Sequence, residues 1–223
     1  MRFTIENYTE GAYPQISQLV GQYTLVEPVS AEGDLADYFA FYGPESSATQ
    51  WTYFPLEPFE DKESLRQHLK MMETSRDPYF LAIKDKETWH VLGTFSIMSI
   101  STANRTAEMG WVLYGDQLKN SRLATEAQYL VMTYIFEELA YRRYEWRCDS
   151  LNTPSNNAAQ RLGFTFEGTF RQAVVYKNNR SRDTNWYSML PEEFQAMKPK
   201  FEKWLAAENF DESGKQIKSL KDC

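Results

Sequence analysis

The sequence predicts a single α+β domain built around a mixed, mostly antiparallel sheet. Residues 79–101 contain two apolar runs on either side of the polar turn Asp85–Thr88, a pattern typical of a β-hairpin. Residues 164–190 repeat this pattern over a greater length, with a turn at 177–181. Amphipathic helical segments lie around these hairpins, and no internal repeat or low-complexity linker divides the 223-residue chain.

Strands and helices alternate through the first half of the chain. The segment 30–43 begins with a serine and ends at Gly43-Pro44, which are signals for the two ends of a helix. An aromatic loop at 51–59 separates this helix from the next one. In chain order, the predicted elements are a strand at 23–29, a helix at 30–43, a helix at 61–75, the hairpin at 79–101 and a strand at 106–115.

The second half begins with an amphipathic helix at 123–139, whose apolar residues form one stripe. Residues 141–150 then alternate aromatic or thiol side chains with charged ones, as in a strand with one polar face. Thr153 is the expected N-cap of a short helix that ends at Gly163. The remaining predicted elements are the hairpin at 164–190 and a closing helix at 191–207.

Composition and charge exclude several classes of protein. The formal net charge is -7 and no long basic run is present, which argues against nucleic acid as a partner. The two cysteines and two histidines match no disulfide framework and no metal-ligand spacing, so we expect no metal. No apolar stretch has the length of a membrane span or the form of a signal peptide. We therefore expect no membrane association and a cytoplasmic location.

A short polar and basic run, Lys119-Asn120-Ser121-Arg122, precedes the amphipathic helix. Cations at this place oppose the positive end of the helix dipole, and the N–H groups of the first turn have no acceptor within the helix. A bound phosphate would satisfy both features, because the N–H groups and the two cations converge on it. A solvated loop without a ligand is the alternative, and these residues by themselves leave both open.

Three segments of the chain resemble the core of the GNAT N-acetyltransferases, in particular their RimJ/RimL-like branch. They are EMGWVL at 108–113, LKNSRLATEA at 118–127 and YRRYEWRCDSLNTPSNNAAQRLGFTFEG at 141–168. The resemblance extends over roughly 23–194 and implies a GNAT-like central sheet flanked by helices. It divides the chain into an N-terminal extension (1–22), an N-acetyltransferase domain (23–206) and a C-terminal tail (207–223).

The same resemblance implies an enzyme that takes acetyl-CoA as co-substrate and acetylates a primary amine. The acceptor is then either a protein α-amine or a small amine. An acyl-CoA-binding sensor or interaction module without turnover is the alternative. The oligomeric state, monomer or homodimer, stays open.

In this family the strand, turn and helix bind the pyrophosphate of acetyl-CoA through backbone N–H groups. Most relatives have glycine where this chain has Asn120 and Arg122. We therefore expect Asn120 to adopt unusual dihedral angles, and Lys119 or Arg122 to add side-chain contacts. The backbone at 111–113 is expected to pair with the pantetheine arm, which requires splayed strands. The coenzyme-binding residues that the resemblance implies are Trp111, Val112, Leu113, Lys119, Asn120, Ser121, Arg122, Leu123, Ala124, Thr125, Asn152 and Ser155.

Proton transfer has three candidate residues. Glu108 resembles a glutamate that acts as general base, through a water, in some family members. Its alternative role is that of an exposed glutamate that balances Arg105. Ser155 is the candidate to protonate the departing thiolate, and Tyr176 is the alternative. Ordinary helix capping is the alternative role of both Asn152 and Ser155.

The aromatic loop at 51–59 is the candidate acceptor site. Trp51 and Tyr53 precede an acidic cluster, and aromatic and anionic groups together attract a protonated amine. We therefore expect this loop to lie at the surface, Trp51 and Tyr53 to line the acceptor channel, and cationic acceptors to be preferred. The alternative is an acceptor bound against the final hairpin, around Tyr176 and Trp186. The acidic cluster consists of Glu57, Glu60 and Asp61.

Overall fold

The computed structural model describes residues 4–223 and contains one eight-stranded sheet in the order β1-β2-β3-β4-β5-β6-β8-β7. Neighbouring strands are antiparallel except β5 and β6, which are parallel. The predicted fold class is therefore confirmed. The strands are β1 (Leu19–Val20), β2 (Thr24–Pro28), β3 (Tyr79–Asp85), β4 (Val91–Ser101), β5 (Thr106–Tyr114), β6 (Arg143–Asp149), β7 (Thr165–Tyr176) and β8 (Arg180–Met189).

Both predicted hairpins form, as β3–β4 and β7–β8. The predicted helix at 123–139 differs in one respect, because its last turn is a π-helix rather than an α-helix. The helices are α1 (Leu35–Tyr42), α2 (Lys62–Thr74), α3 (Arg122–Thr133), α4 (Thr153–Arg161) and α5 (Pro191–Leu205), with short helical turns at Ala48–Trp51, Tyr134–Glu138, Ala207–Asn209 and Leu220–Asp222.

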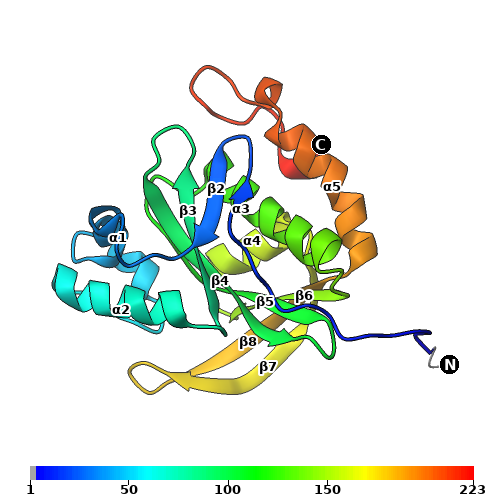
Figure 1. The fold of residues 1–223 in the computed structure, drawn as a ribbon, viewed down its shortest axis with the longest axis horizontal. Coiled ribbons are helices and arrows are strands. Elements are labelled where there is room, and N and C mark those ends of the chain that lie inside the picture. The colour runs from blue at the N-terminus through cyan, green and yellow to red at the C-terminus, as the bar shows by residue number, and fades with distance from the viewer. Residues whose placement is uncertain (1–3) are drawn as a thin grey trace.

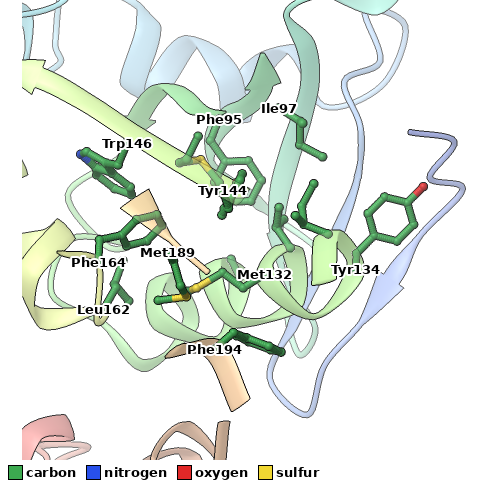
Figure 2. Close-up of a cluster of buried hydrophobic side chains, with 14 of the residues drawn as sticks. Phe95, Ile97, Met132, Tyr134, Tyr144, Trp146, Leu162, Phe164, Met189 and Phe194 are labelled. Atoms are coloured by element: carbon green, nitrogen blue, oxygen red, sulfur yellow. The ribbon is translucent and has the colours of Figure 1, made fainter. Parts of the chain in front are cut away.

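Helices cover both faces of the sheet (Figure 1). Successive strand residues point to opposite faces, so Phe80 joins the cluster under α1 and α2, while Leu81 joins the cluster under α3, α4 and α5. The second cluster is the larger one. Figure 2 shows it, with Tyr144 and Trp146 of β6 lying close to Phe164 and Met189. Burial of these aromatic side chains is the main force that holds the two layers together.

The helix ends use side-chain caps. Asp61 caps α2 by accepting hydrogen bonds from the backbone N–H groups of Glu63 (2.9 Å) and Ser64 (2.8 Å). The N-cap of α4 is Asn152, whose Oδ1 accepts from the N–H of Ser155 at 3.2 Å. The prediction of Thr153 as N-cap is therefore wrong by one residue, since the asparagine side chain reaches the first free N–H groups and Thr153 already has helical geometry.

The two terminal segments pack on the domain. Residues 19–20 form the edge strand β1. The buried Glu126 of α3 accepts the N–H groups of Gln22 (2.7 Å) and Tyr23 (2.8 Å) and fixes the turn that follows β1. In the C-terminal tail, Leu220 is 1% exposed and packs with the core. The boundaries at 22/23 and 206/207 stay predictions.

The sheet opens where β5 and β6 diverge. These strands pair only from Thr106 and Arg143 to Met109 and Trp146, although both continue beyond this point. On its other side, β5 changes register against β4 at a bulge, where Trp111 has a φ of 51°. The diverging strand ends leave main-chain groups of β5 unpaired on the side of β6. The splayed strands that the sequence analysis requires are therefore present.

Candidate active site

A cavity of about 1340 Å³ lies at the opening between β5 and β6. One end of it, the helix end, is formed by residues 119–125, by α4 and by the C-terminal tail. The other end, the strand end, is formed by Glu108, Arg147 and Arg182 from β5, β6 and β8. The loop between α1 and α2 covers it on one side. The lining residues from this loop are Thr49, Gln50, Thr52, Tyr53, Phe54 and Pro55.

The wall between the two ends is the unpaired edge of β5. Trp111, Val112 and Leu113 all line the cavity, as the sequence analysis expects of coenzyme-binding residues. The indole of Trp111 packs edge-on against Phe54 (5.4 Å between ring centroids) and Phe80 (5.7 Å). These contacts hold the bulge in place, so the free N–H and C=O groups have fixed directions.

The turn before α3 presents backbone donors to the helix end. Asn120 has a φ of 56°, the unusual conformation expected for it. Ser121 caps the helix by accepting the N–H of Ala124 at 3.1 Å. Within residues 4–223, the N–H groups of Asn120, Arg122 and Leu123 have no protein acceptor. They lie at the positive end of the α3 dipole, which makes this turn suited to an anion.

Four cations surround this turn. Arg122 stacks on the ring of Tyr23 (3.5 Å from the guanidinium carbon to the centroid) and lies 4.6 Å from the ring of Phe210. Lys119 pairs with Asp116 at 2.7 Å and also donates to Gln50 at 3.2 Å. The other two cations that line the helix end, Arg161 and Lys215, are not among the residues that the sequence analysis singles out.

No local sequence pattern identifies Arg161 and Lys215 as residues of a binding site. Arg161 is the last residue of α4, and its guanidinium donates to Thr125 Oγ1 at 3.2 Å and lies 4.9 Å from the ring of Trp204. Lys215 belongs to the C-terminal tail, outside the predicted domain. Only the packing of the tail against α5 brings it to the cavity. Leu123 differs from its neighbours, because its side chain packs on the core and only its backbone faces the turn.

Asn152 and Ser155 line the cavity at the start of α4. The side-chain oxygen Oδ1 of Asn152 caps α4, as described above. The hydroxyl of Ser155 accepts a hydrogen bond from Trp146 Nε1 at 3.0 Å and is also within hydrogen-bond reach of the Cys148 thiol. The neighbouring Cys148 thiol also lines the cavity, and burial raises its pKa.

Glu108 is 4% exposed and faces the strand end of the cavity. Its carboxylate forms an ion pair with Arg147 and accepts a hydrogen bond from Ser99 Oγ at 2.9 Å. The alternative role, an exposed glutamate that balances Arg105, is wrong. Arg105 instead donates to Thr9 and stacks on Tyr8, because residues 4–13 run past its side of the sheet.

Tyr176 is not brought together with the other candidate catalytic residues. It does not line the cavity, and its hydroxyl donates to Asp149 Oδ2 at 2.6 Å. Burial, and after it the charge of Asp149, raises the pKa of Tyr176 to about 12. Its proton is therefore held in the β6–β8 network rather than directed to the cavity.

The expected acceptor loop is only partly at the surface. Trp51 is 3% exposed, does not line the cavity and donates to Ser46 Oγ at 2.9 Å, so its expected exposure is wrong. The short helical turn at 48–51 directs the indole into the cluster around Tyr42 instead. Tyr53 does line the cavity, and its hydroxyl donates to Leu151 O at 2.8 Å.

The acidic cluster is also placed differently from the expectation. None of its three carboxylates lines the cavity. Glu57 pairs with Lys177 of the β7–β8 turn at 2.9 Å, and Asp61 caps α2. The expected anionic mouth is therefore absent from the cavity wall, because these side chains are used for folding contacts.

The cavity wall is strongly cationic although the protein is acidic as a whole. Among the described residues, its only acidic side chains are Glu108 and Asp149. Against these two carboxylates stand Lys119, Arg122, Arg147, Arg161, Arg182 and Lys215. Six positive and two negative groups give a local excess of four positive charges, whereas the chain carries a formal charge of -7. Such a field concentrates anionic ligands.

Two further observations concern residues 4–223. They contain no helix that is both long and apolar enough to cross a bilayer. Within the same range, no group of three or more His, Cys, Asp or Glu side chains is arranged to hold a metal ion.

Known proteins with related sequences and structures share this architecture. The acetyltransferase (GNAT) domain family model matches residues 24–165. A crystal structure of a GCN5-related N-acetyltransferase from Brucella melitensis is 39% identical and covers 97% of this chain and 98% of its own, with a TM-score of 0.93. An uncharacterized N-acetyltransferase of Bacillus subtilis is 26% identical over 165 residues, 73% of this chain and 93% of that protein. The ribosomal-protein-serine acetyltransferase of Escherichia coli is 25% identical over 140 residues, 63% of this chain and 75% of that protein.

Proposed function

This chain belongs to the acetyltransferase (GNAT) family and is an acetyltransferase, and from that premise we propose that it transfers the acetyl group of acetyl-CoA to a primary amine. The observation that carries the proposal is the cavity between β5 and β6. It joins unpaired main-chain groups of β5 to unpaired N–H groups at the start of α3. The predicted resemblance to RimJ/RimL-like enzymes is consistent with the modest identity to a ribosomal-protein-serine acetyltransferase.

The helix end suits the phosphates of acetyl-CoA. Backbone N–H groups of the turn and the α3 dipole attract phosphate oxygens, and Arg122 supplies a guanidinium that two aromatic rings already hold in place. Arg161 and Lys215 add positive charge from α4 and the tail. The free edge of β5 at 111–113 offers N–H and C=O groups to the amides of the pantetheine arm, as an added strand would. When bound, acetyl-CoA supplies the thioester.

The reaction forms a bond from the amine nitrogen to the carbonyl carbon and breaks the carbon–sulfur bond. The amine must first lose a proton, for which Glu108 is the group in reach of the cavity. The ion pair with Arg147 and the hydrogen bond from Ser99 fix the direction of the Glu108 carboxylate. Ser155 is the proposed donor of the proton that the departing sulfur takes up, since its hydroxyl lines the cavity. A β5 backbone N–H near Trp111 stabilises the charge that develops on the carbonyl oxygen.

Two measurements test this function. Isothermal titration with acetyl-CoA reports binding, and a thiol-release assay over a panel of primary amines reports turnover. We expect binding, and thiol release that depends on the amine. Binding with no amine-dependent release across the panel would favour the alternative, an acyl-CoA-binding module, and no binding at all would contradict both.

A further inference from the structure

The strand end of the cavity has a positive group without a partner. Both of its carboxylates are taken by other arginines. Glu108 pairs with Arg147, and Asp149 pairs with Arg180 at 3.2 Å and accepts the hydroxyl of Tyr176. Arg182 of β8 lines the same wall. It therefore has no ion-pair partner among the described residues.

Arg147 is held firmly beside Glu108. Its guanidinium carbon lies 4.4 Å from the centroid of the Trp186 ring, and the same guanidinium donates to Ser99 Oγ at 2.6 Å. Burial, and after it the nearby charge of Arg182, lowers the pKa of Arg147, which still stays protonated at neutral pH. Arg147 is thus a fixed part of the wall, and Arg147 and Arg182 line the same cavity.

Arg182 is the group that a ligand can still satisfy. It is half-buried, and its Nε is buried without a hydrogen-bond partner within residues 4–223. Thr184 Oγ1 and Trp186 Nε1, which follow on the same face of β8, lack partners as well. Of these three residues only Arg182 lines the cavity. An unpaired buried donor is costly, so the Nε of Arg182 beside the cavity points to an acceptor group that arrives with a ligand.

We propose that the amine acceptor also carries a carboxylate, which Arg182 binds while the amine reaches Glu108. This inference rests on the proposed function and names the substrate class of the same site. A guanidinium binds a carboxylate through two parallel hydrogen bonds, and a carboxylate in turn attracts an ammonium group. Glu108 and Arg182 therefore present opposite charges to the two ends of a zwitterion.

From the acidic cluster, the sequence analysis expects cationic acceptors to be preferred. The proposal instead expects an acceptor that carries a negative charge. The carboxylates of that cluster lie outside the cavity, whereas the wall itself carries the excess of positive charge described above. Two sources offer the required chemistry. One is a free amino acid, and the other is a peptide N-terminus followed by an acidic residue.

The experiment compares each acid with its uncharged amide. The pairs are leucine with leucinamide, and two tetrapeptides that differ only in glutamate or glutamine at the second position. kcat/KM for each acceptor is measured at saturating acetyl-CoA in the wild type, Arg182→Gln and Arg182→Lys. Arg171→Gln, at an exposed position of the neighbouring strand β7, is the matched control for loss of one arginine. The ratio of acid to amide within one variant removes differences in the folded fraction, and comparison of this ratio between variants removes the difference in amine pKa between acid and amide.

We expect Arg182→Gln to reduce the acid-to-amide ratio of at least one pair by about tenfold to a hundredfold, the usual size of a charge-assisted hydrogen bond. The amides should change little, Arg182→Lys should keep part of the preference, and Arg171→Gln should keep all of it. A response confined to the leucine pair identifies a small-molecule acceptor, and one confined to the peptide pair identifies a protein N-terminus. A ratio that is the same in the wild type and Arg182→Gln for both pairs overturns the proposal.

Failure of the proposed function gives a different result. In that case no acceptor releases thiol although acetyl-CoA binds, and the inference is decided by calorimetry of the four acceptors with the coenzyme A complex. Binding of an acid, but not of its amide, that is lost in Arg182→Gln supports the inference. No such charge-dependent binding overturns it.

Discussion

The two ends of the cavity recognise charge by different means. At the helix end the donors are backbone N–H groups fixed by the turn and by α3, and two of the four nearby cations, Arg122 and Arg161, are stacked on aromatic rings. At the strand end the groups are side chains, Glu108, Arg147 and Arg182, that project from three different strands. The first end depends on backbone shape, and the second depends on residue identity.

This difference explains how the turn before α3 can present its backbone donors without glycine at two of its positions. Asn120 and Arg122 occupy positions where the resemblance implies glycine in most relatives, yet Asn120 has the positive φ expected for this turn. The backbone N–H donors remain when glycine is replaced by asparagine or arginine. A side-chain site does not, because one substitution removes the group itself. Substitutions should therefore have their largest effects at the strand end.

The largest expected effect is that of Glu108→Gln. Loss of the general base should lower kcat by about two to four orders of magnitude and leave acetyl-CoA affinity nearly intact, because only proton transfer is removed. Steady-state kinetics between about pH 6 and 9, together with calorimetry, measure both quantities. A rate within about twofold of the wild type over this range would exclude Glu108 as the base.

Glu145→Gln is the matched control for this variant. Glu145 lies opposite Glu108 on the adjacent strand and pairs with Arg143 at 2.6 Å, but it does not line the cavity. The same chemical change there should leave kcat close to that of the wild type. Equal losses in the two variants would show that the effect is structural.

An intermediate effect is expected from Asn120→Val. A β-branched residue at a φ of 56° costs about 1–2 kcal/mol of stability or more, and the turn relieves the strain by moving its N–H groups. Acetyl-CoA affinity should fall about tenfold, the equivalent of about 1.4 kcal/mol. Calorimetry and thermal unfolding measure the two changes.

Two further variants separate strain from binding. Asn120→Gly should keep wild-type affinity, since glycine accepts this conformation. Asn178→Val, in the β7–β8 turn at a φ of 63°, carries the same strain away from the cavity and should lower stability without a change in affinity. Loss of affinity in Asn178→Val would argue against a local role of the α3 turn.

Effects of similar size on acetyl-CoA affinity, but without a loss of stability, are expected from the cations of the helix end. Arg122→Ala should weaken acetyl-CoA binding by about 1–2 kcal/mol, a partly solvated charge-assisted contact. Lys119→Ala should lie at the lower limit of this range, because Asp116 already pairs with Lys119. Calorimetry at two ionic strengths measures both, and the salt dependence should be weaker in each variant. Unchanged affinity in both variants and in the double variant would contradict phosphate binding by these side chains.

Much of the fold follows from local signals. The two hairpins have turn residues between apolar runs, and the helix of 61–75 has its cap at Asp61, so pattern alone locates them within one or two residues. The turn before α3 is also local, since a run of polar residues and the helix dipole identify it. The N-cap at Asn152 and the π-helical end at 134–138 were missed, because neighbouring residues compete closely for these roles.

The sequence by itself therefore determined the order of the main strands and helices, the turn before α3 and the candidate base. Only the tertiary structure decided which residues are buried, which line the cavity and which charges are paired. Trp51 became core because a short helical turn directs it inward, and Lys215 reached the cavity because the tail packs back on α5. Arg182 has no ion-pair partner among the described residues because Glu108 and Asp149 pair with Arg147 and Arg180 from other strands. Local patterns follow from the periodicity of one segment, whereas the partner of a charge depends on contacts between segments far apart in the chain.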